Sequence, residues 1–138
     1  AGDKGKGDAD IRQDFPGGWK GDTNNAFLAN GRTAEQAKYF DFSKKVLNWR
    51  KNAAVIHTGK LTHYIPENNV YVYFRHNDNE TVMVVINNAP DMQKLNLERF
   101  QESIKAFTSG KDIISDKIID LKKELSIDGK TSMILELK

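Results

Sequence analysis

The chain has 138 residues, enough for one domain with a sizeable hydrophobic core or for one domain plus an appendage. Its formal net charge is +2, and its lysines are scattered among acidic residues, so the basic stripe that nucleic-acid binding requires is missing. The absence of cysteine excludes disulfides and thiolate zinc sites, and no run approaches the ~18 apolar residues typical of a membrane-spanning helix, so we expect neither a nucleic-acid nor a membrane partner.

The first 31 residues show no apolar periodicity and contain seven of the ten glycines. A structureless stretch of ~30 residues is uncommon within a compact domain and is usually functional or a cut end. A phosphate-binding loop is excluded, because no strand precedes the glycines and no Gly-Lys-Ser/Thr follows them. Without an initiator methionine or a signal peptide, the segment resembles the interior of a longer protein, and we expect the chain to be a fragment.

The pattern changes at Thr33, which forms a capping-box sequence with Gln36. The following residues are good helix formers, with no proline or glycine before Gly59. Apolar residues recur along one side, so we predict a helix over residues 34–52 that docks along a broad face. This face comprises Ala37, Phe40, Val46, Leu47 and Trp49, with Tyr39 or Phe42 at its margin.

Residues 69–87 are the region around which the rest of the chain is organised. Two runs rich in β-branched and aromatic residues, 70–74 and 82–86, flank a polar stretch, which predicts an antiparallel hairpin. Tyr71 and Tyr73 alternate with valines and a phenylalanine, so neither side of the first strand is wholly polar. A hairpin with two apolar sides lies in the middle of a layered fold, and both of its faces should be covered.

The remaining apolar residues after the helix alternate with a period of two. Residues 98–107 are an exception, because their spacing indicates a short helix or a turn. These patterns predict an antiparallel β-sandwich of about eight strands, preceded by a long loop and one α-helix. The strands expected outside the hairpin are residues 54–57, 60–64, 92–97, 112–115, 117–121, 124–127 and 132–137.

Candidate catalytic or metal-binding groups are sparse. His57 and His63 would be roughly 20 Å apart on one strand, with a turn between them, so a shared metal is not expected. No Ser–His–Asp spacing is present, and we predict no catalytic residue, metal or cofactor within this chain. The periodicity favours packing roles for Tyr71, Tyr73 and Trp49. It leaves open whether Trp19, in the loop after residues 16–18, packs or binds sugar.

Several motifs together resemble the alpha-amylase family of glycoside hydrolases, in particular the neopullulanase and cyclomaltodextrinase type. They are DIRQDFPGGW at residues 10–19, NAF at 25–27, RTAEQ at 32–36, LNWRKN at 47–52 and VIHTGKLTHY at 55–64. The resemblance implies a (β/α)8 barrel followed by an antiparallel sandwich. Residues 1–53 would be the end of the barrel, comprising the loop after strand 8 and the last helix. Residues 54–138 would be the C-terminal sandwich.

The catalytic carboxylates of this family lie on barrel strands upstream of this chain. The resemblance therefore implies a non-catalytic part of an enzyme that hydrolyses α-glucans: starch, maltooligosaccharides, pullulan or cyclodextrins. Its partners would be the glucan, bound through the parent enzyme, and the barrel, which the sandwich stabilises. The alternatives are a starch-binding sandwich without hydrolase activity and a structural domain with no ligand. The resemblance favours a periplasmic or extracellular location.

Substrate-binding residues can be carried over only for the loop. Related enzymes have an Asp-x-x-x-Arg that hydrogen-bonds sugar, and Asp8 and Arg12 fit this spacing, with Asp10 or Asp14 as alternatives to Asp8. Trp19 joins them as a candidate stacking residue.

Overall fold

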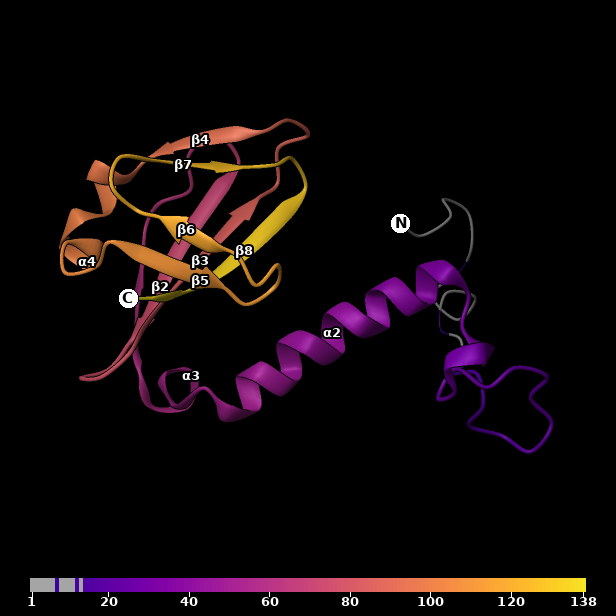
Figure 1. Cartoon of the computed structure of the whole chain (residues 1–138). Helices are drawn as coiled ribbons and strands as arrows, with labels where there is room; N and C mark the ends of the chain where they lie inside the picture. The colour runs from indigo at the N-terminus through magenta and orange to yellow at the C-terminus, as the bar shows by residue number, and fades with distance from the viewer. Residues whose placement is uncertain (1–6, 8–11, 13) are drawn as a thin grey trace. The chain divides into compact units, whose positions relative to one another are not determined.

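The computed structural model describes residues 7, 12 and 14–138, which divide into two compact units at Ser43/Lys44. The described part of the first unit contains a loop, the 3-10 helix η1 (Ala29–Gly31) and the start of helix α2 (Ala34–Asn52). The second unit contains the rest of α2, the short helix α3 (Ala54–Thr58) and two β-sheets (Figure 1). Among the described residues, no helix is long and apolar enough to cross a membrane.

Helix α2 begins at the predicted capping box. The backbone N–H of Thr33 donates to Gln36 Oε1 at 2.9 Å, and the N–H of Gln36 donates to Thr33 Oγ1 at 3.2 Å. The helix ends at Asn52, as predicted, but none of its residues is buried. Tyr39 and Leu47 are 65% and 62% exposed, whereas Ala37, Val46 and Trp49 are half-buried, so the apolar side of α2 is only partly covered.

Two antiparallel sheets form the sandwich, which confirms the predicted fold class. The larger sheet has the strand order β1-β2-β3-β8-β5-β6, and the smaller one pairs β4 with β7 (Figure 1). Helices η2 (Leu97–Phe100) and α4 (Gln101–Ile104) follow β4, within the region predicted to hold a short helix or turn. The strands are β1 (Lys60–His63), β2 (Val70–His76), β3 (Thr81–Asn87), β4 (Gln93–Asn96), β5 (Ser109–Asp112), β6 (Ile118–Asp120), β7 (Glu124–Ile127) and β8 (Thr131–Leu137).

The main core lies on the inner face of the β2–β3 hairpin. Its register pairs Val72 with Val85 and Phe74 with Met83, as the alternation predicts. These four side chains are 0–3% exposed. They belong to one buried cluster with side chains from the smaller sheet and from η2 and α4, namely Leu95, Leu97, Phe100, Ile104, Leu125 and Ile127.

The outer face of the hairpin is only partly covered. Val82 and Val84 pack with Val55 of α3, flanked by the half-buried Trp49. Farther along the same face, Ile86 is 39% exposed. The prediction that both faces are covered therefore holds for the end of the hairpin beneath α3 and not for the opposite end.

Two predicted strands are wrong. Residues 54–57 were expected to be extended, but 54–58 form α3. Val55 is 1% exposed there, and its N–H donates to Glu80 Oε2 at 3.1 Å. The strand expected at 112–115 is instead β5, three residues earlier. Gly110 allows that close pairing, because a Cβ atom there would lie 3.0 Å from the Cβ of Leu135. Asp112 then turns the chain away from the sheet.

Candidate functional site

Trp19 lies in a tight loop that is closed by Asp22. The backbone N–H groups of Gly17 and Trp19 both donate to Asp22 Oδ2, at 2.7 and 3.1 Å. Gly17 has a φ of +97°, which glycine adopts without strain, and a Cβ atom there would lie 2.4 Å from Asn25 Oδ1. The loop is therefore shaped by its own sequence, and it leaves the Trp19 side chain 67% exposed.

The three motif segments of the first unit meet at Ala26, which is 6% exposed. Its N–H donates to the carbonyl oxygen of Pro16 at 2.9 Å, and its own carbonyl accepts from Arg32 Nη1 at 2.8 Å. The Arg32 guanidinium also lies 3.8 Å above the centre of the Phe40 ring. These motif residues thus determine the conformation of the loop and its connection to α2.

The predicted substrate-binding residues are only partly within the described structure. Asp8 and its alternative Asp10 lie outside the described residues. Arg12 and the other alternative, Asp14, are exposed. The predicted pairing of Asp8 with Arg12 on a sugar therefore stays a prediction, and Trp19 is the member of the set whose surroundings are described in full.

The histidines have separate partners. His57 Nε2 lies 2.9 Å from the carbonyl oxygen of Arg50, and His76 Nε2 lies 3.1 Å from Thr62 Oγ1. Within the described part of the chain, no three histidine, aspartate or glutamate side chains are grouped closely enough to hold a metal ion.

The C-terminal half of α2 is fastened to the large sheet by two polar contacts. Trp49 Nε1 donates to Glu136 Oε1 of β8 at 2.7 Å. Lys45 Nζ donates to the carbonyl oxygen of Ile114 at 2.8 Å and forms an ion pair with Asp116. The hydrogen bond and charge of Lys45 hold the pKa of the exposed Asp116 carboxyl below its ordinary value. We call these two contacts the helix joint.

Asp112 supports the turn to which Lys45 is attached. Its side chain is buried, and Oδ1 accepts from the N–H groups of Ile114 and Ile134 at 3.3 and 3.1 Å. Oδ2 accepts from the N–H and the hydroxyl of Ser115 at 2.9 and 2.6 Å. This role was not predicted from the sequence, although an aspartate three residues before a serine is a turn signal.

A row of rings lies on the outer face beside the uncovered end of the hairpin. The rings of Tyr71 and Tyr73 are 5.5 Å apart, and His63 stands edge-on to Tyr71 at 6.3 Å. Burial raises the pKa of the Tyr73 hydroxyl, with a further contribution from Tyr71. Both tyrosines are half-buried, in keeping with the packing role that was predicted for them.

Residues 61–136, more than half of the chain, match the family described as the cyclo-malto-dextrinase C-terminal domain. The chain belongs to this family. The matched span begins in β1 and ends in β8, so the cyclomaltodextrinase C-terminal domain is the two-sheet sandwich itself. The resemblance to the alpha-amylase family that the motifs indicated is thereby confirmed.

Solved structures share the fold of this cyclomaltodextrinase C-terminal domain at low identity. An Anoxybacillus alpha-amylase is 17% identical with a TM-score of 0.65, over 73% of this chain and 22% of that one. An alpha-amylase from Geobacillus thermoleovorans, complexed with acarbose, is 19% identical with a TM-score of 0.65, over 78% and 24%. A mutant of the trehalulose synthase MutB, in complex with the substrate sucrose, is 20% identical with a TM-score of 0.60, over 83% and 20%.

The structural matches include residues that precede the family span. They cover only a small part of the length of each neighbour. Residues 60–138 make up 79 of the 138 residues, so a match over 73% or more of the chain must include residues before β1. The chain itself spans about a fifth of the length of the solved structures, 20–24%.

Proposed function

We propose that this chain is the C-terminal part of an alpha-amylase-type glycoside hydrolase that acts on α-glucans. In this proposal residues 1–53 complete the (β/α)8 catalytic barrel, and residues 54–138 form a non-catalytic sandwich that stabilises it. The observation that carries the proposal is the helix joint, because it fastens a long helix with uncovered apolar side chains to a sandwich of the cyclomaltodextrinase C-terminal domain family.

The uncovered side of α2 supports a barrel as the partner. Tyr39, Phe42 and Leu47 are 65%, 45% and 62% exposed on a helix without a buried residue. Helices in proteins gain most of their stability from packing of an apolar face, and exposed apolar patches mark interaction surfaces. Two of the structural neighbours are alpha-amylases, and the matched part of this chain includes residues before the sandwich. A barrel completed by α2 would cover this face.

A non-catalytic role agrees with the carboxylates that the structure describes. Glycoside hydrolysis requires two carboxyl groups held ~5–10 Å apart across the scissile bond, with access to the substrate. Asp112 is buried and uses both oxygens to accept hydrogen bonds from neighbouring backbone and serine groups. Asp22 likewise closes its own loop. These two carboxylates have structural roles, and in this proposal the catalytic carboxylates belong to the rest of the parent enzyme.

The first prediction concerns the helix joint. We expect Trp49→Ala to lower the free energy of unfolding by about 2–3 kcal/mol, since a half-buried ring and one hydrogen bond are lost. Trp49→Phe, which keeps a ring and removes the N–H donor to Glu136, should cost about 1 kcal/mol. Urea unfolding of the 138-residue chain measures both. The control is Leu47→Ala on the exposed side of α2, which should cost under ~0.5 kcal/mol. Equal losses of unfolding free energy in Trp49→Ala and Leu47→Ala would contradict a stabilising role of the helix joint.

The second prediction tests the proposed function through the loop. In the proposed function Asp8 and Arg12 hydrogen-bond glucose hydroxyls, and the exposed indole of Trp19 stacks on a sugar ring. Arg12→Ala then removes charge-assisted hydrogen-bond donors from subsites that are remote from the scissile bond. We expect kcat/KM of the parent enzyme on long maltooligosaccharides to fall about 10- to 100-fold, and to change much less on a short substrate that does not reach these subsites.

Lys20→Ala, which removes an exposed cation from the same loop, is the matched control and should leave both rates unchanged. An unchanged ratio of long to short substrate in Arg12→Ala would refute the subsite. A parent enzyme that hydrolyses no α-glucan at all would refute the proposed function itself.

A further inference from the structure

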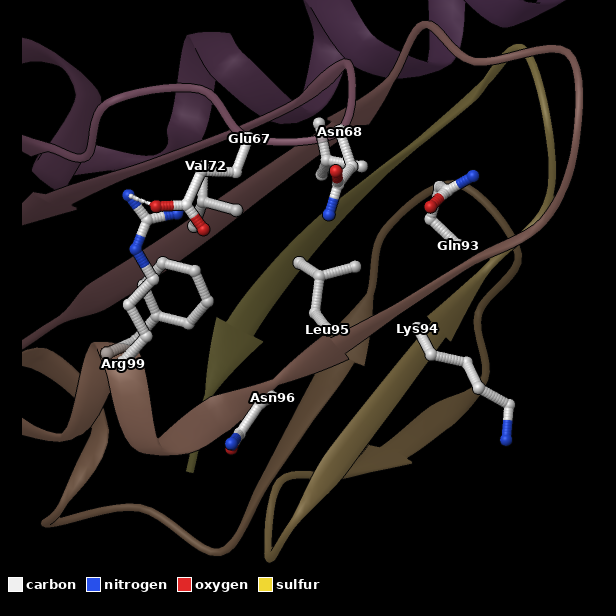
Figure 2. A pocket seen from close by; sticks show the side chains of 10 residues that line it. Glu67, Asn68, Val72, Gln93, Lys94, Leu95, Asn96 and Arg99 are labelled. Carbon is white, nitrogen blue, oxygen red and sulfur yellow. Dashed lines mark ion pairs between the residues drawn. The ribbon is translucent and has the colours of Figure 1, made fainter.

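A pocket of ≈ 360 Å³ opens on the sandwich between the start of β2, strand β4 and helix η2 (Figure 2). Its floor is apolar, formed by Val70, Val72, Leu95 and Phe100, which are 2–8% exposed. These four side chains also belong to the main core. The floor is therefore held by the packing of the whole sandwich, and the shape of the pocket exists before any ligand arrives.

The charged groups of the pocket neutralise one another. Arg99 forms an ion pair with Glu67 at 2.9 Å, drawn as a dashed line in Figure 2, and also donates to the carbonyl oxygen of Ile65 at 2.7 Å. Lys94 pairs with Glu124 of the neighbouring strand at 3.0 Å, and its side chain extends away from Leu95. Because both cations have carboxylate partners, the pocket offers no excess charge to an anion or a cation.

Two carboxamides remain available on opposite sides of the floor. Figure 2 shows the amide of Asn68 directed into the space near Leu95, with Gln93 across from it. Within the part of the chain that the structure describes, neither side chain has a hydrogen-bond partner. Each amide offers an acceptor oxygen and two donor hydrogens.

Asn68 is held in place by a tight turn between β1 and β2. Glu67 and Val70 exchange two backbone hydrogen bonds, at 3.1 and 2.8 Å, and the two residues between them have positive φ angles of 50° and 60°. This is the geometry of a type I′ turn, in which asparagine and glycine are the favoured residues. Glycine can therefore replace Asn68 without changing the turn, so that Asn68→Gly removes the carboxamide alone.

From this arrangement we propose that the pocket is an accessory binding site for a neutral oligosaccharide. A pyranose ring presents adjacent hydroxyls, each a donor and an acceptor, which the carboxamides of Asn68 and Gln93 can match. It also presents an apolar C–H face that can lie over Leu95, which at 8% is the most exposed apolar side chain of the floor. The choice of an α-glucan as the oligosaccharide rests on the proposed function. The ring of Phe100 is too buried to stack on sugar, so the affinity is weak, with a Kd of about 1 mM.

The test is a titration of the ¹⁵N-labelled 138-residue chain with maltopentaose up to about 20 mM, followed by amide chemical shifts. The expected result is saturable shifts at residues 67–70 and 93–96. Asn68→Gly and Gln93→Met should each weaken binding roughly 3- to 10-fold, and the double variant should abolish saturation. Asn79→Gly, the same change in the exposed β2–β3 loop, should bind as the unaltered chain does.

The proposal is overturned if neither maltopentaose nor cellopentaose shifts the amides of these residues, if the shifts cluster at another surface, or if the double variant binds normally. A parallel titration with cellopentaose distinguishes the existence of the site from the choice of its ligand. If cellopentaose binds the pocket and maltopentaose does not, the oligosaccharide site stands and its assignment to α-glucans falls. If neither binds while the parent enzyme hydrolyses maltooligosaccharides, the proposed function stands and the accessory site falls.

Discussion

Replacing Asn87 with alanine is expected to lower the free energy of unfolding by about 3–5 kcal/mol. Asn87 is 1% exposed and lies at the end of β3. Its Nδ2 donates to the carbonyl oxygens of Asp91, Ile127 and Asp128 at 2.9, 3.2 and 3.0 Å, and its Oδ1 accepts from the N–H of Ala89 at 2.8 Å. Truncation leaves these groups without their partner, and a buried polar group without a partner costs about 1–3 kcal/mol.

The matched control is Asn88→Ala, one residue farther along. Asn88 is exposed, and its side-chain oxygen accepts from Lys130 Nζ at 3.0 Å. This change should cost under ~1 kcal/mol. Urea unfolding of the two variants measures the difference. If the free energy of unfolding falls by the same small amount in both variants, the amide of Asn87 does not connect the β3–β4 turn to the β7–β8 turn.

The second large effect is expected for Asp112→Asn, which replaces one carboxylate oxygen with an NH2 group and removes one negative charge. Each carboxylate oxygen of Asp112 accepts two hydrogen bonds. In either orientation of the new amide, its NH2 group therefore replaces an acceptor and faces two hydrogen-bond donors. Losing two charge-assisted hydrogen bonds in a buried site should cost about 3–5 kcal/mol. For a unit of this size, that corresponds to a fall in Tm of roughly 12–25 °C.

Thermal unfolding of Asp112→Asn is best compared with that of Asp128→Asn. Asp128 is exposed in an Asp-Gly turn, where asparagine is equally suited, so its Tm should stay within about 3 °C. A similar Tm for the two variants would show that the Asp112 carboxylate is not needed. Because the turn after Asp112 carries the Ile114 carbonyl that Lys45 binds, the Asp112 variant should also weaken the attachment of α2 to the sheet.

The features that could be predicted from the sequence are those with a local cause. Thr33 and Gln36 form the capping box because both partners lie within one helical turn. The β2–β3 hairpin follows from alternating residues on either side of a polar loop, and its register places Phe74 opposite Met83 as the alternation requires. In both cases the residues that decide the structure are neighbours in the sequence.

The features that were missed depend on residues far apart in the chain. Residues 54–58 have strand-like composition, yet they form a helix, and Glu80, 25 positions away from Val55, accepts from the Val55 N–H in its first turn. The Trp49 partner Glu136 is 87 positions away. Among the candidate site residues, Trp19 was correctly placed in a loop. Its exposure, which the sequence left open, depends on how Asp22 and Ala26 close that loop.

The position of β8 in the large sheet has a consequence for how the molecule is made. In chain order β8 is the last strand of the sheet, yet it lies in the middle, between β3 and β5. A ribosome releases the β1–β2–β3 half first, and β5 with β6 later. Neither half can join the other until residues 131–137 have emerged. Until then the edges of β3 and β5 that pair with β8 have no partner strand, so a stalled or shortened nascent chain is the form most open to aggregation and to proteolysis.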